Sequence, residues 1–189
     1  MNYLEALTKA QEIKGLLVPH CFKIEIAGSI RRKKPNNIKD IEIVCIPKPY
    51  STGIFIDGFA KIVNKWEKKK GDLKGVGRSK YTQRLWTDGT KIDIFITTQK
   101  SFGKILAIRT GSADFSHKIL AKRWRELGYV GRDGILCDLV TGESVEDFPT
   151  EESFFSFLNI DYIEPEFRNV DTKGRVINFI TPTVLKLNE

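Results

Sequence analysis

The sequence has little cysteine and no long apolar run, and each absence excludes a class of protein. Its cysteines are odd in number and widely spaced, at Cys21, Cys45 and Cys137, so they predict neither a disulfide framework nor a zinc site. The apolar runs, such as Ile41 to Ile46, are strand-sized and fall well short of the ~20 residues that a membrane-spanning helix needs. The first residues also lack the apolar core of a signal peptide. We therefore expect a cytoplasmic protein with reduced, buried cysteines.

What the chain does contain is enough apolar sequence for a core and an excess of positive charge. It has 189 residues, of which 41% are hydrophobic, so one compact domain or two tightly packed subdomains can form. The formal net charge is +7. Basic side chains cluster at 31–34, at 65–70 and at 118–125. Such clusters are typical of nucleic-acid binding through phosphates, but a solvated basic surface explains them equally well.

Hydrophobic periodicity and turn residues predict an α+β fold. We expect a mixed β-sheet with helices in residues 1–99, and a smaller C-terminal subdomain in 100–189. The predicted helices are 3–17, one through Phe59 and Trp66 that ends near Gly71, 100–108, 112–127 and 151–158. The predicted strands are 22–27, 40–46, 80–86 and 91–97, with short pieces near 133–134 and 141–142 and a further stretch at 175–180.

Acidic residues interrupt two of the most apolar predicted strands. Asp40 and Glu42 are two residues apart, so on a strand their carboxylates share one face while Ile41 and Ile43 point into the core. Asp93 stands between isoleucines in the same way. If the two strands are neighbours, three carboxylates meet at one place, where bound Mg²⁺ ions relieve their repulsion. Acids that simply face water are the alternative, and for Asp-x-Glu alone the commoner one.

A Gly-Ser turn followed by arginines precedes the first acidic strand and favours the metal-site reading. Glycine at a strand end allows close approach to a ligand, serine offers a hydroxyl and an amide, and arginine binds phosphate with a forked pair of donors. The turn is Ala27-Gly28-Ser29-Ile30-Arg31-Arg32. This order, a Gly-Ser turn, an acid pair and then a third acid, is much rarer by chance than any one of its parts.

Taken together, these motifs resemble the family X DNA polymerases, of which DNA polymerase β is the best-known type. The resemblance begins at Gly28–Arg32, continues through Asp40–Glu42 and Lys91–Asp93, and reaches Arg109–Ser112. It extends into 125–129, 151–152 and 162–168, and so covers roughly residues 22 to 168 in the family's order. It implies a nucleotidyltransferase palm with a thumb-like second half, which adds deoxynucleotides to a primer 3′-hydroxyl by two-metal phosphoryl transfer, as in short-gap DNA repair.

The resemblance also implies roles for individual residues. Asp40 and Glu42 would bind both Mg²⁺ ions, for which Mn²⁺ can substitute, and Asp93 would bind the catalytic ion and help to deprotonate the primer hydroxyl. The nucleoside triphosphate would be bound by Gly28, Ser29, Arg32, Lys39, Arg109, Gly111 and Ser112. The DNA primer-template would be bound by Arg31, Lys33, Lys118, Lys122 and Arg123. We expect a monomer, and a cis peptide between Gly111 and Ser112 of the kind that costs ~3 kcal/mol without proline.

Four departures from the family leave alternatives open. Glu42 stands where the family usually has aspartate, Lys39 where it often has glycine, and Ile108-Arg109 where animal members have an aromatic pair that selects deoxyribose. Only about twenty residues precede the first palm strand, so we expect no lyase activity. One alternative is a nucleotidyltransferase with a non-DNA acceptor. Another is a non-catalytic nucleic-acid-binding module in which the acids have no role.

Overall fold

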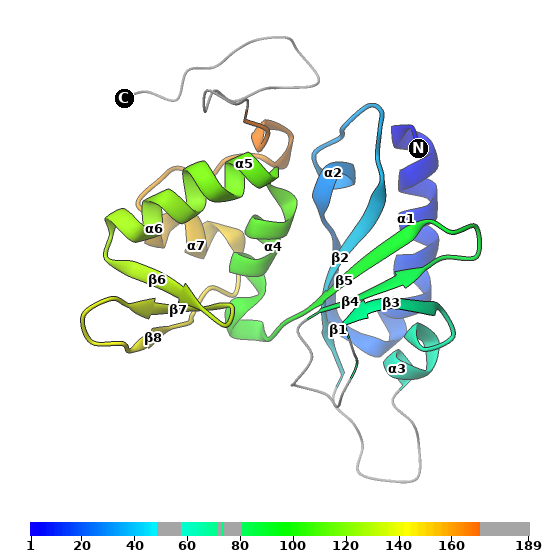
Figure 1. Cartoon of the computed structure of the whole chain (residues 1–189), viewed down its shortest axis with the longest axis horizontal. Helices are drawn as coiled ribbons and strands as arrows, with labels where there is room; N and C mark the ends of the chain where they lie inside the picture. Colours follow the sequence, from blue (N-terminus) through cyan, green and yellow to red (C-terminus); the bar gives the residue numbers. More distant parts are fainter. Residues whose placement is uncertain (49–57, 72, 74–80, 171–189) are drawn as a thin grey trace, which may run out of the picture. The chain divides into compact units, whose positions relative to one another are not determined.

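A computed structural model describes residues 1–48, 58–71, 73 and 81–170, and the chain divides into two compact units, Met1–Thr98 and Gln99–Glu189. Each unit contains its own β-sheet and its own buried apolar cluster (Figure 1). The α+β class predicted from the sequence is confirmed: a mixed five-stranded sheet is joined in the chain to a small antiparallel three-stranded sheet and several helices.

The first unit is built on the five-stranded sheet. Its strands are β1 (Cys21–Ile26), β2 (Asp40–Pro47), β3 (Glu67–Gly71), β4 (Tyr81–Leu85) and β5 (Lys91–Ile96), in the spatial order β1-β2-β5-β4-β3. β2 and β5 pair in parallel, whereas the other neighbours pair antiparallel. The β4–β5 hairpin turns at Asp88-Gly89, where Trp86 N–H donates to the Thr90 carbonyl at 2.8 Å. The hairpin predicted from Asp-Gly is therefore confirmed.

One face of this sheet packs on helices. Helix α1 (Tyr3–Leu17) begins after Asn2, whose side chain accepts a hydrogen bond from Glu5 N–H, and α3 (Gly58–Val63) is a shorter helix. The core between helices and sheet contains the alternate residues of β2 and β5, namely Ile41, Ile43, Ile92 and Ile94, each fully buried. Because side chains alternate along a strand, the residues between them lie on the opposite face of the sheet.

The second unit packs helices on the small sheet. Its helices are α4 (Phe102–Thr110), a helical stretch made of α5 (Ala113–Phe115), the π-helical segment η3 (Ser116–Ala121) and α6 (Lys122–Glu126), and α7 (Glu151–Phe157). Its strands are β6 (Tyr129–Arg132), β7 (Ile135–Asp138) and β8 (Ser144–Val145). Thr150 caps α7 as predicted, with its hydroxyl accepting from Ser153 N–H at 3.2 Å. The core includes Phe115, Phe154 and Phe155, all fully buried.

Three sequence-based assignments were wrong in the first unit. Residues 67–71 were expected to end a helix, but they form β3, because pairing with β4 prevails over a weak local helical preference. The helical spacing of Leu4, Leu7, Ile13 and Leu17 predicts one apolar face, but Leu4 is 72% exposed, since Ala6 and Ala10 occupy the buried face of α1. The alternation of Phe22, Ile24 and Ile26 predicts that they share one face, but Phe22 is 67% exposed because the pairing of β1 is irregular between Cys21 and Lys23.

Other expectations concern the cysteines, the tail and membranes. The three cysteines are free and buried, as predicted. The predicted stretch at 175–180 lies outside the described residues. Within the described ranges, every helix is too short or too polar to cross a bilayer.

Candidate functional site: carboxylates on neighbouring strands

The parallel pairing of β2 with β5 brings the acidic residues of the first unit to one face of the sheet. Glu42 pairs in register with Asp93, and Asp40 pairs with Lys91. In-register residues of neighbouring parallel strands point to the same side. Because Ile41 and Ile92 point into the helix-covered core, Asp40, Glu42 and Asp93 all lie on the opposite face. The condition set by the sequence, that the two acidic strands be neighbours, is therefore met.

Acidic and basic side chains influence one another on this face of the sheet. Burial raises the pKa of the Asp40 carboxyl, the negative charge of Asp93 raises it further, and Lys91, Arg32 and Lys39 oppose the rise. Burial lowers the pKa of the Arg32 guanidinium, against the opposing effect of Glu42 and then of Asp40. Arg32 therefore lies within electrostatic reach of both acids of β2, as expected of a residue that would share phosphate binding with a metal site.

Asp93 is the most enclosed of the three acids. It is 8% exposed, and its Oδ1 accepts hydrogen bonds from two residues of β4. The Tyr81 hydroxyl donates at 2.6 Å and the Gln83 amide at 2.9 Å. Neither donor was predicted from the sequence, although the hairpin that joins β4 to β5 places Gln83 opposite Asp93.

Gly28 begins the short helix α2 (Gly28–Arg31), directly after β1, in a conformation that favours glycine. Its φ is +62°, in the left-handed region. A Cβ atom at this position would lie 1.8 Å from Oε2 of Glu42. The Glu42 carboxylate therefore occupies the space beside Gly28, and the approach of a ligand to this glycine stays a prediction. Ser29 follows on the same helical turn, which ends at Arg32.

Gly28→Ala is expected to destabilise the first unit. The added methyl group meets the Glu42 carboxylate and the residue must keep an unfavourable φ, so we expect a loss of about 1–2 kcal/mol in unfolding free energy. Urea denaturation measures it. Gly15→Ala is the control, because nothing lies within 4 Å of a Cβ atom at that helical position, and it should stabilise the protein by about 0.5–1 kcal/mol. Equal stability of Gly28→Ala and the wild type would contradict the role of Gly28.

The donor chemistry of these acids fits a hard divalent cation, although their side chains are not gathered around one point. Carboxylate oxygens are the ligands that Mg²⁺ prefers. Among residues 1–48, 58–71, 73 and 81–170, no three His, Cys, Asp or Glu side chains are grouped closely enough to hold a metal ion. Glu42 lies against Gly28 while Asp93 accepts bonds from β4. Glu42 is the neighbour of Asp93 in register.

The second unit contains the other residues predicted to bind nucleotide. Arg109 is exposed near the end of α4, and Gly111 and Ser112 join α4 to α5. The Ser112 hydroxyl caps α5 by accepting from Phe115 N–H at 3.1 Å, and Ser112 N–H donates to the Arg168 carbonyl at 2.9 Å. The expected cis peptide was wrong, since the described backbone contains none. The trans bond counts against close kinship with the family members that have the cis form.

The three residues of the second unit that were predicted to bind DNA are paired with acids of their own helical stretch. Lys118 lies 3.1 Å from Asp114, and Glu126 lies 3.7 Å from Lys122 and 3.4 Å from Arg123. All the pairs are partly exposed, and such surface pairs are weak. A phosphate group can therefore compete for the two lysines. Arg123 is less available because its Nε also donates to the Leu158 carbonyl at 2.8 Å.

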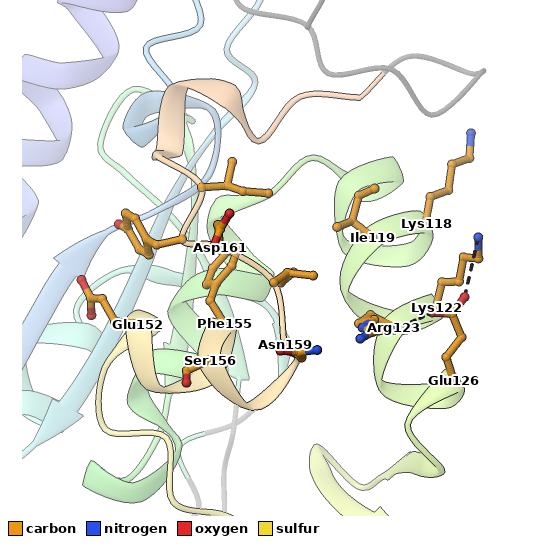
Figure 2. Close-up of a pocket in the computed structure, with 13 residues that line it drawn as sticks. Lys118, Ile119, Lys122, Arg123, Glu126, Glu152, Phe155, Ser156, Asn159 and Asp161 are labelled. Carbon is orange, nitrogen blue, oxygen red and sulfur yellow. Dashed lines mark hydrogen bonds and ion pairs between the residues drawn. The ribbon is translucent and has the colours of Figure 1, made fainter. Parts of the chain in front are cut away.

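A cavity of about 980 Å³ lies beside these residues, between the 113–126 helical stretch and the segment that contains α7. Its lining carries basic and acidic side chains in equal number, together with apolar ones. In Figure 2, the side chains of Lys118 and Lys122 extend away from the wall that bears Phe155 and Asp161. The cavity therefore does not gather its cations around one anionic ligand.

The buried ion pairs of the second unit were also not predicted from the sequence. Nearness in sequence predicts an acid such as Glu164 as the partner of Arg168, but Arg168 is fully buried and pairs with Glu151. Glu164 is exposed, so it cannot neutralise a cation inside the core. Lys104, which is 2% exposed, pairs with Glu146 and donates to the Gly134 carbonyl at 2.8 Å. These pairs join α4 and α7 to other segments of the unit.

No protein-family model matches the chain, and a search of curated proteins finds no match.

Proposed function

We propose that the chain is a nucleotidyltransferase of the family X DNA polymerase type, which adds deoxynucleotides to a primer 3′-hydroxyl. In this proposal, Met1–Thr98 serves as the palm and the second unit as the thumb. The observation that carries the proposal is the in-register parallel pairing of Glu42 with Asp93, with Asp40 on the same face. The Gly28 turn and Arg32 support it, because they adjoin these acids.

The chemistry would be an in-line displacement at the α-phosphorus of a nucleoside triphosphate. The primer oxygen forms the new P–O bond, the bond to pyrophosphate breaks, and Asp93 helps to remove the hydroxyl proton. Asp40, Glu42 and Asp93 would hold two divalent cations, which in such sites activate the attacking oxygen and stabilise the leaving one. Arg32 would bind the terminal phosphates through its forked donors, beside the Gly28–Ser29 turn.

The second unit would orient the substrates. Arg109, Gly111 and Ser112 would bind the incoming nucleotide. The donors would be the Arg109 guanidinium and backbone N–H groups, because the Ser112 hydroxyl already caps α5. Lys118 and Lys122 would exchange their partly exposed acidic partners for DNA phosphates, with a gain from counterion release. Arg31 and Lys33 would bind DNA phosphates from the first unit.

A second candidate is a nucleotidyltransferase whose acceptor is not DNA. The observation that favours it is the pairing of Lys118, Lys122 and Arg123 with acids of their own helical stretch, which reduces the positive potential available for a polyanion. The active-site chemistry would be unchanged, and only the acceptor would differ.

A primer-extension assay separates the two candidates. A labelled primer in a one-nucleotide gap is incubated with Mg²⁺ or Mn²⁺ and each deoxynucleoside triphosphate in turn. The DNA polymerase proposal predicts extension by one residue with the complementary nucleotide. Absence of extension on gapped, recessed and single-stranded primers would contradict it, whereas triphosphate turnover without DNA would favour the second candidate.

A further inference from the structure

Two residues of β4 contact the carboxylate of Asp93 without belonging to the acidic triad. We propose that Tyr81 and Gln83 are positioning residues, which hold Asp93 in the orientation that its proposed role in nucleotidyl transfer requires. This inference rests on the proposed function and adds to it a pair of residues from the neighbouring strand.

The geometry of the two hydrogen bonds is specific. Both end on the same oxygen, since the Tyr81 hydroxyl lies 2.6 Å from Asp93 Oδ1 and the Gln83 amide nitrogen 2.9 Å from it. Two donors on one oxygen fix the rotation of the carboxylate about its side-chain bonds, and they leave Oδ2 as the oxygen available for another ligand. Hydrogen bonds to ionised acceptors are about twice as strong as neutral ones, and at 8% exposure water competes little for this carboxylate.

Both donors are themselves held in place. Gln83 pairs with Asp93 across the β4–β5 ladder, so its amide needs only to reach across one interstrand spacing. The Tyr81 ring stacks on Phe95, with 5.1 Å between ring centroids and 28° between planes. Phe95 is two residues after Asp93 on β5, so the ring that orients the hydroxyl is anchored on the strand that carries the acceptor. Neither donor depends on a long unsupported side chain.

The consequence for the reaction follows from the contrast with Glu42. Glu42 lies against Gly28, whereas the Asp93 carboxylate accepts hydrogen bonds from two residues of β4. Because two donors already hold the Asp93 carboxylate, this metal ligand would keep one orientation. Outer-shell hydrogen bonds of this kind orient metal ligands, and their loss typically costs ~10–100-fold in metal affinity or activity. Tyr81 and Gln83 therefore should affect turnover and metal dependence more than the KM for the triphosphate.

The test uses Tyr81→Phe, which keeps the stacked ring, and Gln83→Met, which keeps the side-chain length, singly and combined. Steady-state primer extension on the gapped duplex gives kcat, the KM for the triphosphate and the Mg²⁺ concentration at half-maximal rate. Tyr162→Phe is the matched control, because its hydroxyl also donates to a carboxylate, Glu151, at 3.3 Å in the other unit. Gln11→Met, at an exposed position of α1, is the control for the second change. Thermal unfolding of every variant separates folding from function.

We expect each single substitution to lower kcat about 10-fold and the double substitution at least about 50-fold, with a higher Mg²⁺ requirement. The KM for the triphosphate should change less than about 3-fold, and the controls should match the wild type. If the wild type extends primers and Asp93→Asn does not, while both single variants keep kcat and the Mg²⁺ requirement, the positioning role is overturned and the proposed function stands. If the wild type itself extends no primer, both fall. If the double variant does not fold, the two single variants still test the proposal.

Discussion

Asp93→Asn is expected to lower primer extension by at least about 10³-fold at saturating Mg²⁺. A metal ligand that also receives the hydroxyl proton contributes several kcal/mol to the barrier, and each 1.36 kcal/mol corresponds to about tenfold in rate. The asparagine keeps an oxygen for the hydrogen bonds from Tyr81 and Gln83, so the fold of the sheet should persist. Single-turnover extension of the gapped primer measures the rate of the chemical step.

The control for this substitution is an acid of the same sheet that is not among the three proposed metal ligands. Glu25→Gln on β1 removes a partly exposed carboxylate that pairs with Lys14 at 3.0 Å. It should leave extension within about twofold of the wild type, since surface ion pairs contribute little. If Asp93→Asn still extends the primer at the wild-type rate, the reaction takes place elsewhere on the molecule.

Arg168→Met is expected to destabilise the second unit by about 3–5 kcal/mol, because it leaves Glu151 as an unpaired charge in the interior. Arg168 is fully buried, Glu151 is 5% exposed, and the Arg168 Nε donates to the Ile163 carbonyl at 2.7 Å. The guanidinium also lies over the rings of Phe155 and Tyr162, at 4.9 Å and 5.2 Å from their centroids. Urea denaturation and amide hydrogen exchange along α7 measure the loss.

A double-mutant cycle separates the buried charge from lost packing. Adding Glu151→Gln to Arg168→Met removes the unpaired charge, so the double variant should be more stable than Arg168→Met alone. Arg125→Met, which truncates an exposed arginine on α6, should change stability by no more than about 0.5 kcal/mol. Strictly additive losses in the cycle would contradict a coupled Arg168–Glu151 pair.

The acidic face was predictable because its residues break a strong local pattern. An acid between isoleucines on an otherwise apolar strand is conspicuous at Asp40, Glu42 and Asp93, and the alternation of strands dictates which face they occupy. The parallel pairing of β2 with β5 could not be predicted from the sequence, because pairing depends on contacts between segments distant in sequence. The β4–β5 hairpin could have identified Gln83, since its short turn fixes the register.

Other features had no local signal. Lys68 to Lys70 read equally well as a basic helix end, and only pairing with β4 makes them a strand. Arg84 resembles a surface arginine in the sequence, yet it is 3% exposed, and its guanidinium donates to Asn64 at 3.0 Å. Such groups are buried because the folded chain supplies their partners, and no window of neighbouring residues contains that information.

Binding of Mn²⁺ in the presence of a nonhydrolysable deoxynucleoside triphosphate tests the central claim most directly. Electron paramagnetic resonance counts the bound ions without requiring DNA or turnover, after correction for ions held by free nucleotide. The account predicts two ions per chain in the wild type, and loss of at least one in Asp93→Asn and in Glu42→Gln. A wild-type protein that binds no more Mn²⁺ than the nucleotide alone would contradict a metal site at these carboxylates.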